Sequence, residues 1–332
     1  MGATTGIVGA TVITLGLLTL PTLLRRGYDP GVACGAICAS GTLGQIIPPS
    51  LILILLSDIL QLSVGTLFAA AVMPGLLLAA LYCIYIVVLG MMRPEMVPPV
   101  PKKEREAMPR AQLWFKFFKV VLPPLALVLS VLGSIIGGIA APTEAASMGA
   151  LGSILVTAVA GRMSVKMLRE TVQATARITA MVMFILICAQ VFSLAFRGLH
   201  GEDLISALFE FLPGGVNADI WFLMALIFVL GFFIEWIEIS YIAVPLFLPV
   251  FVSQNVDLVW LAMLICLNLQ TSFLTPPFGW ALFFLRGVTP PEITTRHMYV
   301  GVIPFIAMQI LGVLLVFLFP QLALWLPKAI GW

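Results

Sequence analysis

The sequence has little charge and almost no histidine. Only 10% of its 332 residues are charged, whereas about a quarter are charged in soluble domains, and histidine occurs twice. Hydrophobic residues make up 61% of the chain, and the mean hydropathy is +1.13. This composition excludes a soluble globular protein and predicts an all-α polytopic protein embedded in a lipid bilayer. The uncharged runs provide for about seven or eight spanning segments of roughly 20 residues each.

The basic residues indicate topology rather than a nucleic-acid partner. The formal net charge is only +2, and the cations lie in short loops instead of forming a face, so no nucleic acid is expected to bind. The most polar stretch is 93–119, and by the positive-inside rule it is predicted to be a cytoplasmic loop. Its second half, 113–119, alternates aromatic residues with lysine and predicts an interfacial segment.

Cysteine and histidine give no sign of catalysis. All five cysteines lie inside apolar segments, and we interpret them as small buried residues rather than metal or redox ligands. The two histidines, His200 and His297, lie in predicted loops with no nucleophile beside them. An intramembrane enzyme is therefore a less favoured interpretation, and no cofactor is expected.

Two polar, proline-containing breaks interrupt apolar runs in the two halves of the chain. The first is Ser40–Ser50, with Pro48-Pro49, and the second is Thr271–Gly279, with Pro276-Pro277. Backbone groups freed at such a break cannot face lipid, because each unpaired group costs several kcal/mol, so the breaks are expected to line a cavity. We predict two re-entrant helical hairpins, at about 31–58 and 258–285, a pattern typical of binding sites in secondary transporters.

The spacing of prolines indicates an internal, inverted-type repeat. Aligning the two Pro-Pro pairs places Pro74 opposite Pro304 to within two residues. We interpret 1–92 as a partial, N-terminally truncated first repeat, 93–119 as the cytoplasmic loop and interfacial segment, and 120–332 as the second repeat.

The orientation of the first hairpin region conflicts with the charges around it. If Arg25-Arg26 and the 93–119 loop are both cytoplasmic, a re-entrant hairpin plus one span between them gives an odd number of crossings. Either the arginine pair is an exception or the first hairpin region contains a full crossing.

Several ordered motifs together resemble one transporter family. They are the two breaks, with Asn268-Leu-Gln preceding the second, Met73-Pro-Gly75 and Pro142-Thr-Glu-Ala-Ala146. The chain resembles the DctM-type large membrane subunit of TRAP transporters, the tripartite ATP-independent periplasmic class, along nearly its whole length. The resemblance implies an elevator-type, Na⁺-coupled importer of organic acids in the bacterial inner membrane. It also implies two partners, a small TRAP membrane subunit and a periplasmic substrate-binding protein.

The breaks supply the candidate binding residues. Carbonyls at the end of a half-helix suit Na⁺ as coupling ion, and amides at the start of the next suit a small organic anion. The candidate residues are Ser40, Gly41, Thr42, Gly44, Pro48, Pro49, Ser50, Asn268, Thr271, Ser272, Thr275, Pro276, Pro277 and Gly279, with Na⁺ expected at Gly41, Thr42, Thr271 and Thr275. The alternative is a pair of proline-kinked helices whose hydroxyls bond back to their own turn. Asn268 fits either a ligand or an interhelical hydrogen bond.

Three charged residues inside apolar segments are possible charge partners. Glu235 and Glu238 either balance an intramembrane cation or lie solvated at a helix end. Arg177 either extends to the interface or contacts a substrate carboxylate. A fourth charged residue, Glu144, is expected to stabilise the first turn of its own helix. The alternatives for the whole protein are an ion channel and a stand-alone anion/Na⁺ symporter.

Overall fold

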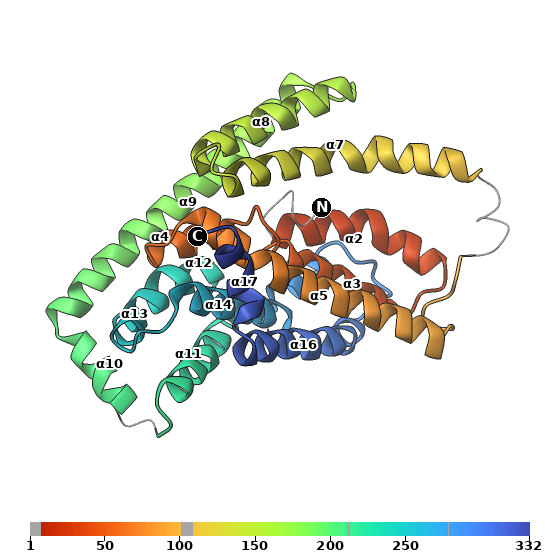
Figure 1. Ribbon diagram of the computed structural model, residues 1–332. Coiled ribbons are helices and arrows are strands. Elements are labelled where there is room, and N and C mark those ends of the chain that lie inside the picture. Colours follow the sequence, from red (N-terminus) through yellow and green to blue (C-terminus); the bar gives the residue numbers. More distant parts are fainter. Residues whose placement is uncertain (1–7, 101–108, 211–212, 278) are drawn as a thin grey trace.

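The computed structural model describes residues 8–100, 109–210, 213–277 and 279–332, and every regular element in these ranges is a helix (Figure 1). Six segments within them are long and apolar enough to cross a membrane, namely Val8–Arg25, Val64–Met92, Trp114–Ile136, Val165–Gly198, Trp236–Ser253 and Thr295–Leu318. The predicted all-α polytopic membrane fold is confirmed. The predicted loop residues 101–108 lie outside the described residues.

The first four helices are α2 (Val8–Arg25), α3 (Pro30–Leu43), α4 (Leu51–Ile59) and α5 (Val64–Met92). Asp29 caps α3, because its carboxylate accepts a hydrogen bond of 3.0 Å from the Val32 amide. The Asp29 amide in turn donates to the Met96 carbonyl at 2.9 Å. The start of α3 therefore lies beside the end of α5, and Arg25, Arg26 and Arg93 share one end of the molecule, which we call the basic end.

The expected hairpin at 31–58 is wrong, because α3 and α4 together form one interrupted crossing. Helix α5, of 29 residues, runs back over about 43 Å to the basic end, and α4 leads into its start after four residues. The 14-residue α3 and the 9-residue α4 must therefore cover that length in the other direction, and both pack against α5. A full crossing here gives an even number of crossings between the two basic segments.

The second break has the same architecture, so the hairpin expected at 258–285 is also wrong. Here α14 (Leu258–Leu274) and α15 (Trp280–Arg286) precede the long α16 (Thr295–Leu318), and both pack against it. The Trp260 indole donates to the Val316 carbonyl at 2.8 Å, which places the start of α14 beside the end of α16. The pair α14 and α15 thus runs the length of α16 in the opposite direction.

The two units are inverted relative to each other. Helices α3 and α16 run parallel, because Gly31 packs against the His297 carbonyl at their starts and Thr42 bonds to Gln309 further along. Since α14 runs against α16, α3 and α14 point in opposite directions. Equivalent residues keep a constant separation of 228, as for Asp29 and Asp257, which both cap helices, and for Pro48 and Pro276. The internal repeat is therefore structural as well as sequential.

The hairpin of this molecule lies at 216–253. It consists of α11 (Val216–Leu230), a turn, and then α12 (Trp236–Glu238), the π-helix η1 (Ile239–Ala243) and α13 (Val244–Ser253). The Gln254 amide donates to the Asp219 carboxylate at 2.7 Å, so the hairpin enters and leaves at the same end. That end is opposite the basic end, because α14 starts there. At the turn, a Cβ on Gly231 would collide with the Ser272 side chain of α14.

The remaining helices surround this core. Helices α7 (Arg110–Ile136) and α8 (Pro142–Val159) pack together above it in Figure 1, and the long α9 (Val165–Gly198) runs down one side to α10 (Gly201–Glu210). The last helix, α17 (Gln321–Ala329), packs on α5. The interfacial segment predicted at 113–119 is continuous with α7. Glu144 stabilises the start of α8 as predicted, because its carboxylate accepts from the Ala141 amide at 2.9 Å.

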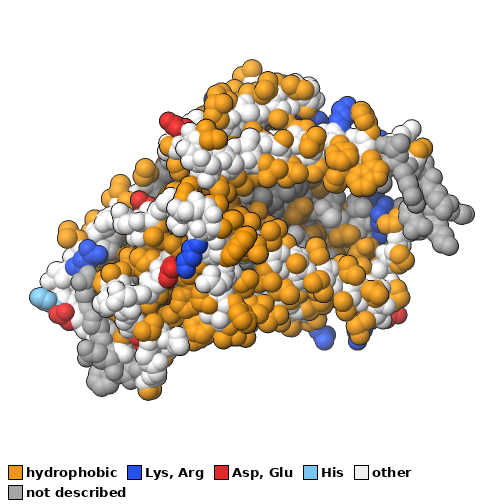
Figure 2. Space-filling model, in the orientation of Figure 1, with side chains coloured by type: hydrophobic (Ala, Val, Ile, Leu, Met, Phe, Trp, Pro, Cys, Tyr) orange, Lys and Arg blue, Asp and Glu red, His pale blue; other side chains and the backbone are white. Residues whose placement is uncertain are grey.

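Apolar side chains cover most of the visible surface, and charged ones are sparse (Figure 2). The outer helices are the most exposed. In the most apolar 18-residue stretch of each, only 6% of α7 and 11% of α9 is buried inside the chain. Since a soluble protein would not leave such faces in water, these faces are suited to lipid or to another membrane helix.

The contact between α3 and α16 depends on glycine. A Cβ built on Gly35 would collide with the Gly301 carbonyl, and one on Gly301 would collide with the backbone of Gly31. Small residues at a helix crossing let backbones approach closely, which provides the van der Waals packing that holds membrane helices together. The inverted units are therefore joined along a seam that leaves no room for a side chain.

We expect Gly35→Leu to separate α3 from α16 and to lower the thermal unfolding midpoint of the detergent-purified protein. Overpacking of a tight contact costs about 1–3 kcal/mol or more. The matched control is Gly133→Leu in α7, where an added Cβ meets no atom within 4 Å. Equal unfolding midpoints for the two variants, measured by dye fluorescence on heating, would contradict the close contact between α3 and α16.

We also expect Gly231→Ala to push the hairpin turn away from α14. The clash is with one side chain, so adding Ser272→Gly should restore most of the lost stability. Gly198→Ala, in open space at the end of α9, serves as the control. The same heating experiment measures the unchanged protein, both single variants, the double variant and the control, and strict additivity of the two changes would show that the contact does not exist.

Candidate functional site

The two breaks cross in the middle of the molecule. The Cys38 thiol in α3 lies 3.6 Å from the Ala281 carbonyl of α15, and the Cys266 thiol in α14 lies 3.9 Å from the Gln45 carbonyl in the first break. Cys38 and Cys266 are equivalent positions of the repeat, separated by the same 228 residues. Helix α14 thus contacts the first break, and α3 contacts α15 directly after the second break, so the predicted site residues from both halves lie around one centre.

The first break is closed by local hydrogen bonds. Its hydroxyls donate to carbonyls of the same turn: Ser40 to Ile37 at 3.0 Å, Thr42 to Ala39 at 2.9 Å, and Ser50 to Gln45. Apart from Ser40, which is exposed, the hydroxyls are buried. Of the two candidate glycines here, Gly41 makes room for Val12 of α2, and Gly44 has an ordinary right-handed φ of −62°.

The second break follows the same pattern. Thr271 donates to Leu267 at 3.1 Å, Ser272 to Leu269 at 2.7 Å and Thr275 to Thr271 at 2.8 Å. The turn needs a glycine, because Gly279 has a φ of +45° at the start of α15. Pro276-Pro277 is a cis bond, as is Pro48-Pro49, and the Pro277 carbonyl accepts from the Tyr299 hydroxyl at 3.0 Å.

These hydrogen bonds determine whether the hydroxyl groups can still donate to or accept from a ligand. A threonine hydroxyl that donates its proton to a helix carbonyl keeps its oxygen lone pairs free to accept. An oxygen in that state is a ligand for a cation and not a donor to an anion. Thr42, Thr271 and Thr275 therefore present oxygen atoms near the crossing, and the assignment of Na⁺ to them stays a prediction.

Asn268 forms an interhelical hydrogen bond. Its amide nitrogen donates to the Met224 carbonyl of α11 at 2.6 Å, so the side chain ties α14 to the first arm of the hairpin. Asn268 and Thr271 also line a cavity of about 210 Å³ between α11, α14 and α16. Of the two interpretations from the sequence, the structure shows the interhelical bond.

The three candidate charge partners lie in different places. Glu235 ends the hairpin turn and is half-buried, and Glu238 follows in α12, with one carboxylate oxygen buried and without a hydrogen-bond partner. Both carboxylates thus lie at the turn that packs on α14. Arg177 is exposed on α9, and it lines neither the cavity beside Asn268 nor the larger cavity between the first break and α7 and α8. The lipid-interface interpretation of Arg177 fits this position better than a substrate contact.

Three buried glutamines are not among the residues predicted from the sequence. Gln45, Gln270 and Gln309 are at most 1% exposed, and each has a side-chain atom with no hydrogen-bond partner. Gln309 Nε2 donates to the Thr42 hydroxyl at 3.3 Å, which adds α16 to the first break. The sequence signal that could have indicated them is an amide side chain in an otherwise apolar helix, because an unpaired buried amide costs free energy.

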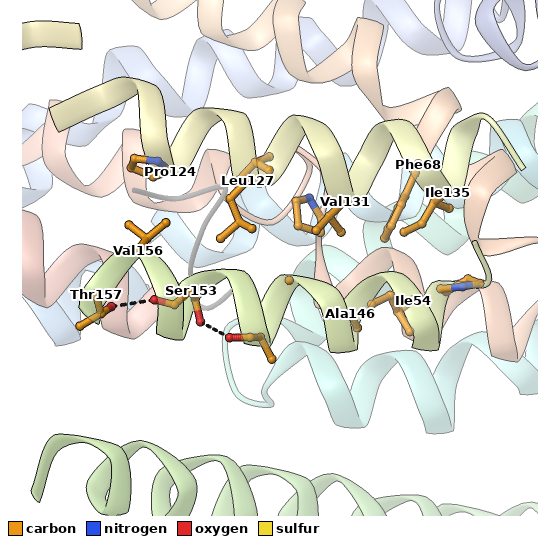
Figure 3. A pocket seen from close by; sticks show the side chains of 15 residues that line it. Ile54, Phe68, Pro124, Leu127, Val131, Ile135, Ala146, Ser153, Val156 and Thr157 are labelled. Carbon is orange, nitrogen blue, oxygen red and sulfur yellow. Dashed lines mark hydrogen bonds between the residues drawn. The ribbon is translucent and has the colours of Figure 1, made fainter. Parts of the chain in front are cut away.

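A cavity of about 490 Å³ separates the first break from α7 and α8 (Figure 3). Pro49, Ile54 and Phe68 form its inner wall. The polar lining side chains are Ser153 and Thr157, and both donate to carbonyls of their own helix at 2.8 Å. This cavity is therefore apolar and offers nothing to hold an organic anion. No group of three or more His, Cys, Asp or Glu side chains suited to a metal occurs in the described ranges.

Known proteins resemble the chain along almost its whole length. The C4-dicarboxylate TRAP transporter large permease protein of Pseudomonas aeruginosa is 29% identical, over 99% of this chain and 75% of its own. The ectoine TRAP transporter large permease protein of Halomonas elongata is 30% identical, over 98% and 74%. The sialic acid TRAP transporter large permease protein of Vibrio cholerae is 30% identical, over 95% and 71%.

The family model of the tripartite ATP-independent periplasmic transporter DctM component matches residues 1–322. Its members are membrane transport proteins and not enzymes, which agrees with the fold and with the lack of a catalytic constellation in the sequence. The chain is a multi-pass inner-membrane protein and belongs to the DctM component family of TRAP transporters.

Proposed function

We propose that this chain is the large permease subunit of a Na⁺-coupled importer of a small organic acid. The observation that carries the proposal is the crossing of two inverted, interrupted helices whose breaks meet at the centre of the molecule. In secondary transporters, unwound backbone and half-helix ends in inverted repeats bind the substrate and its coupling ion.

The oxygen atoms at the crossing support Na⁺ as the coupling ion. Thr271 and Thr275 in the second unit keep free lone pairs, and Thr42 in the first unit keeps one besides the lone pair that accepts from Gln309. The first turn of α4 supports an anion site, because Ser50 does not cap it and leaves its amides available. Cation and anion would then lie close to each other, which couples their binding electrostatically.

The relatives support the substrate class and the partners. Their names state C4-dicarboxylate, ectoine and sialic acid, all of which carry a carboxylate. In this proposal a periplasmic binding protein delivers the anion, and a small membrane subunit covers part of the exposed apolar face of the outer helices. The core that contains the breaks moves as an elevator against that outer layer, across the lipid bilayer.

Reconstitution tests the proposal directly. Proteoliposomes that contain this chain, the small subunit and the binding protein should take up a labelled organic acid only with an inward Na⁺ gradient, and the rate should saturate. Flux at channel rates without the binding protein would instead support an ion channel, and saturable flux without it would support a stand-alone symporter.

We expect Thr275→Val to raise the Na⁺ concentration for half-maximal uptake by about tenfold or more, because one charge-assisted contact is worth about 1.5–3 kcal/mol. Thr289→Val is the matched control, since Thr289 also donates to a carbonyl of its own turn, at 3.1 Å, but lies beyond α15. An unchanged Na⁺ dependence in Thr275→Val would remove Thr275 from the ion site.

A further inference from the structure

The base of the hairpin, where α11 begins and α13 ends, contains a buried carboxylate. Asp219 lies in the first turn of α11 and is only 3% exposed. Its Oδ2 accepts the hydrogen bond of 2.7 Å from Nε2 of Gln254, the residue that caps the end of α13. Asp219 therefore joins the two arms of the hairpin at the end that lies away from the crossing of the breaks.

The second oxygen of this carboxylate is unbonded. Asp219 Oδ1 is buried and has no hydrogen-bond partner among the described residues, and the same is true of Gln254 Oε1. Both atoms are acceptors, and they belong to two groups that one hydrogen bond already joins. A buried acceptor without a partner is costly, so two of them on adjacent groups indicate that a ligand binds there.

The surrounding sequence provides no cationic side chain to balance the charge. The chain contains no lysine or arginine between Arg197 and Arg286, a stretch that includes the whole hairpin and α14. Within the ranges that the structure describes, no basic side chain forms a salt bridge with Asp219. The dipole of α11 favours a negative charge at its start, but it leaves Oδ1 without a ligand.

The two unbonded oxygens fit a hard cation. A water molecule could donate to both, but it would leave the buried carboxylate charge without compensation. Carboxylate and amide oxygens are ligands that hard cations prefer. The neighbouring Asn217 and Asn255 are exposed, so water can complete the coordination. Since Asp219 supplies one negative charge, a monovalent ion gives a neutral site, whereas a divalent ion leaves an excess positive charge.

The site is separate from the crossing of the breaks. Asp219 and the turn at Gly231, which packs on Ser272 of the second break, are separated by about 18 Å of helix. The base of the hairpin lies opposite the basic end, so the positive-inside rule predicts that it faces the periplasm. An ion can therefore reach the base from outside without passing the central site.

We propose that Asp219 and Gln254 bind a Na⁺ ion that holds the two arms of the hairpin together at its base. The ion contacts Asp219 Oδ1 and Gln254 Oε1, while the hydrogen bond between Gln254 Nε2 and Asp219 Oδ2 sets the distance between the arms. This Na⁺ has a structural role. It is distinct from the coupling ion proposed at the crossing, and the inference does not depend on the import function.

Heating of the detergent-purified chain tests the site. With choline chloride keeping the ionic strength constant, the unfolding midpoint should rise with Na⁺ concentration, because an ion that binds only the folded chain stabilises it. We expect Asp219→Asn to lower this rise by about 2 °C for each tenfold increase in Na⁺ concentration above the dissociation constant. Asp257→Asn is the matched control, since Asp257 is an exposed carboxylate that caps α14, and asparagine caps a helix equally well. An equal rise in the unchanged protein and in Asp219→Asn would overturn the site.

A second variant tests the charge of the site even where Asp219→Asn fails to fold. Gln254→Glu places a second carboxylate beside Asp219, so the site should then prefer Ca²⁺, whose affinity increases with the number of charged oxygen ligands. We expect the unfolding midpoint of Gln254→Glu to rise with added CaCl₂ and that of the unchanged protein to stay constant. A midpoint of Gln254→Glu that does not respond to Ca²⁺ would overturn the placement of a cation between these side chains.

The coupling ion and the hairpin ion are distinguished by combining variants. Because sites this far apart act independently, the losses of Na⁺-dependent stability in Asp219→Asn and Thr275→Val should add. A Na⁺-dependent midpoint that requires Asp219, together with uptake that requires no Na⁺, would uphold the hairpin site while the proposed coupling fails. A Na⁺ dependence that disappears entirely in Thr275→Val would overturn the hairpin site and leave the proposed coupling intact.

Discussion

The structure depends on one constraint: a helix broken inside a membrane must satisfy its freed backbone groups away from lipid. Each break here is shielded by the other unit, because Cys266 of α14 contacts the first break and Cys38 of α3 contacts α15 directly after the second break. The hydroxyls of both breaks then bond the carbonyls of their own turns. The free-energy cost of unpaired backbone groups is thus lowered in two ways. Side chains bond to carbonyls of the same turn, and the other unit of the repeat keeps the breaks away from lipid.

The inverted repeat also explains why the close seam lies where it does. Two units that cross at their breaks must bring their long helices against the interrupted helices of the other unit. For α3 and α16 this requires backbone contact at Gly31, Gly35 and Gly301, since any side chain there would move the crossing. The glycines are therefore a consequence of the geometry of the breaks rather than a separate feature of the fold.

The sequence predicted the breaks, the repeat and the role of Glu144 at the start of its helix, but not the direction of the chain at each break. A proline-containing interruption ends a helix in the same way whether the next half turns back or continues. Two features decide the direction at the first break: the length of α5, and the hydrogen bond from the Asp29 amide to the Met96 carbonyl. The length can be read from the sequence, but the hydrogen bond cannot. The hairpin at 216–253 leaves only one sign in the sequence, the charged residues Glu235 and Glu238 within apolar segments. Likewise, Gln45, Gln270 and Gln309 became site residues only once the crossing brought them to the centre.

Helix α4 and the hairpin each connect one break to the end of the molecule opposite the basic end. Helix α4 follows directly on Ser50 in the first break and ends at Ile59, a length of about 13 Å for its nine residues. The hairpin does the same for the second break, since Gly231 at its turn packs on Ser272 while Gln254 bonds to Asp219 at its far end. Because both connections are made of hydrogen-bonded helix, each break is held in place by an element that spans the distance between the centre of the molecule and this end.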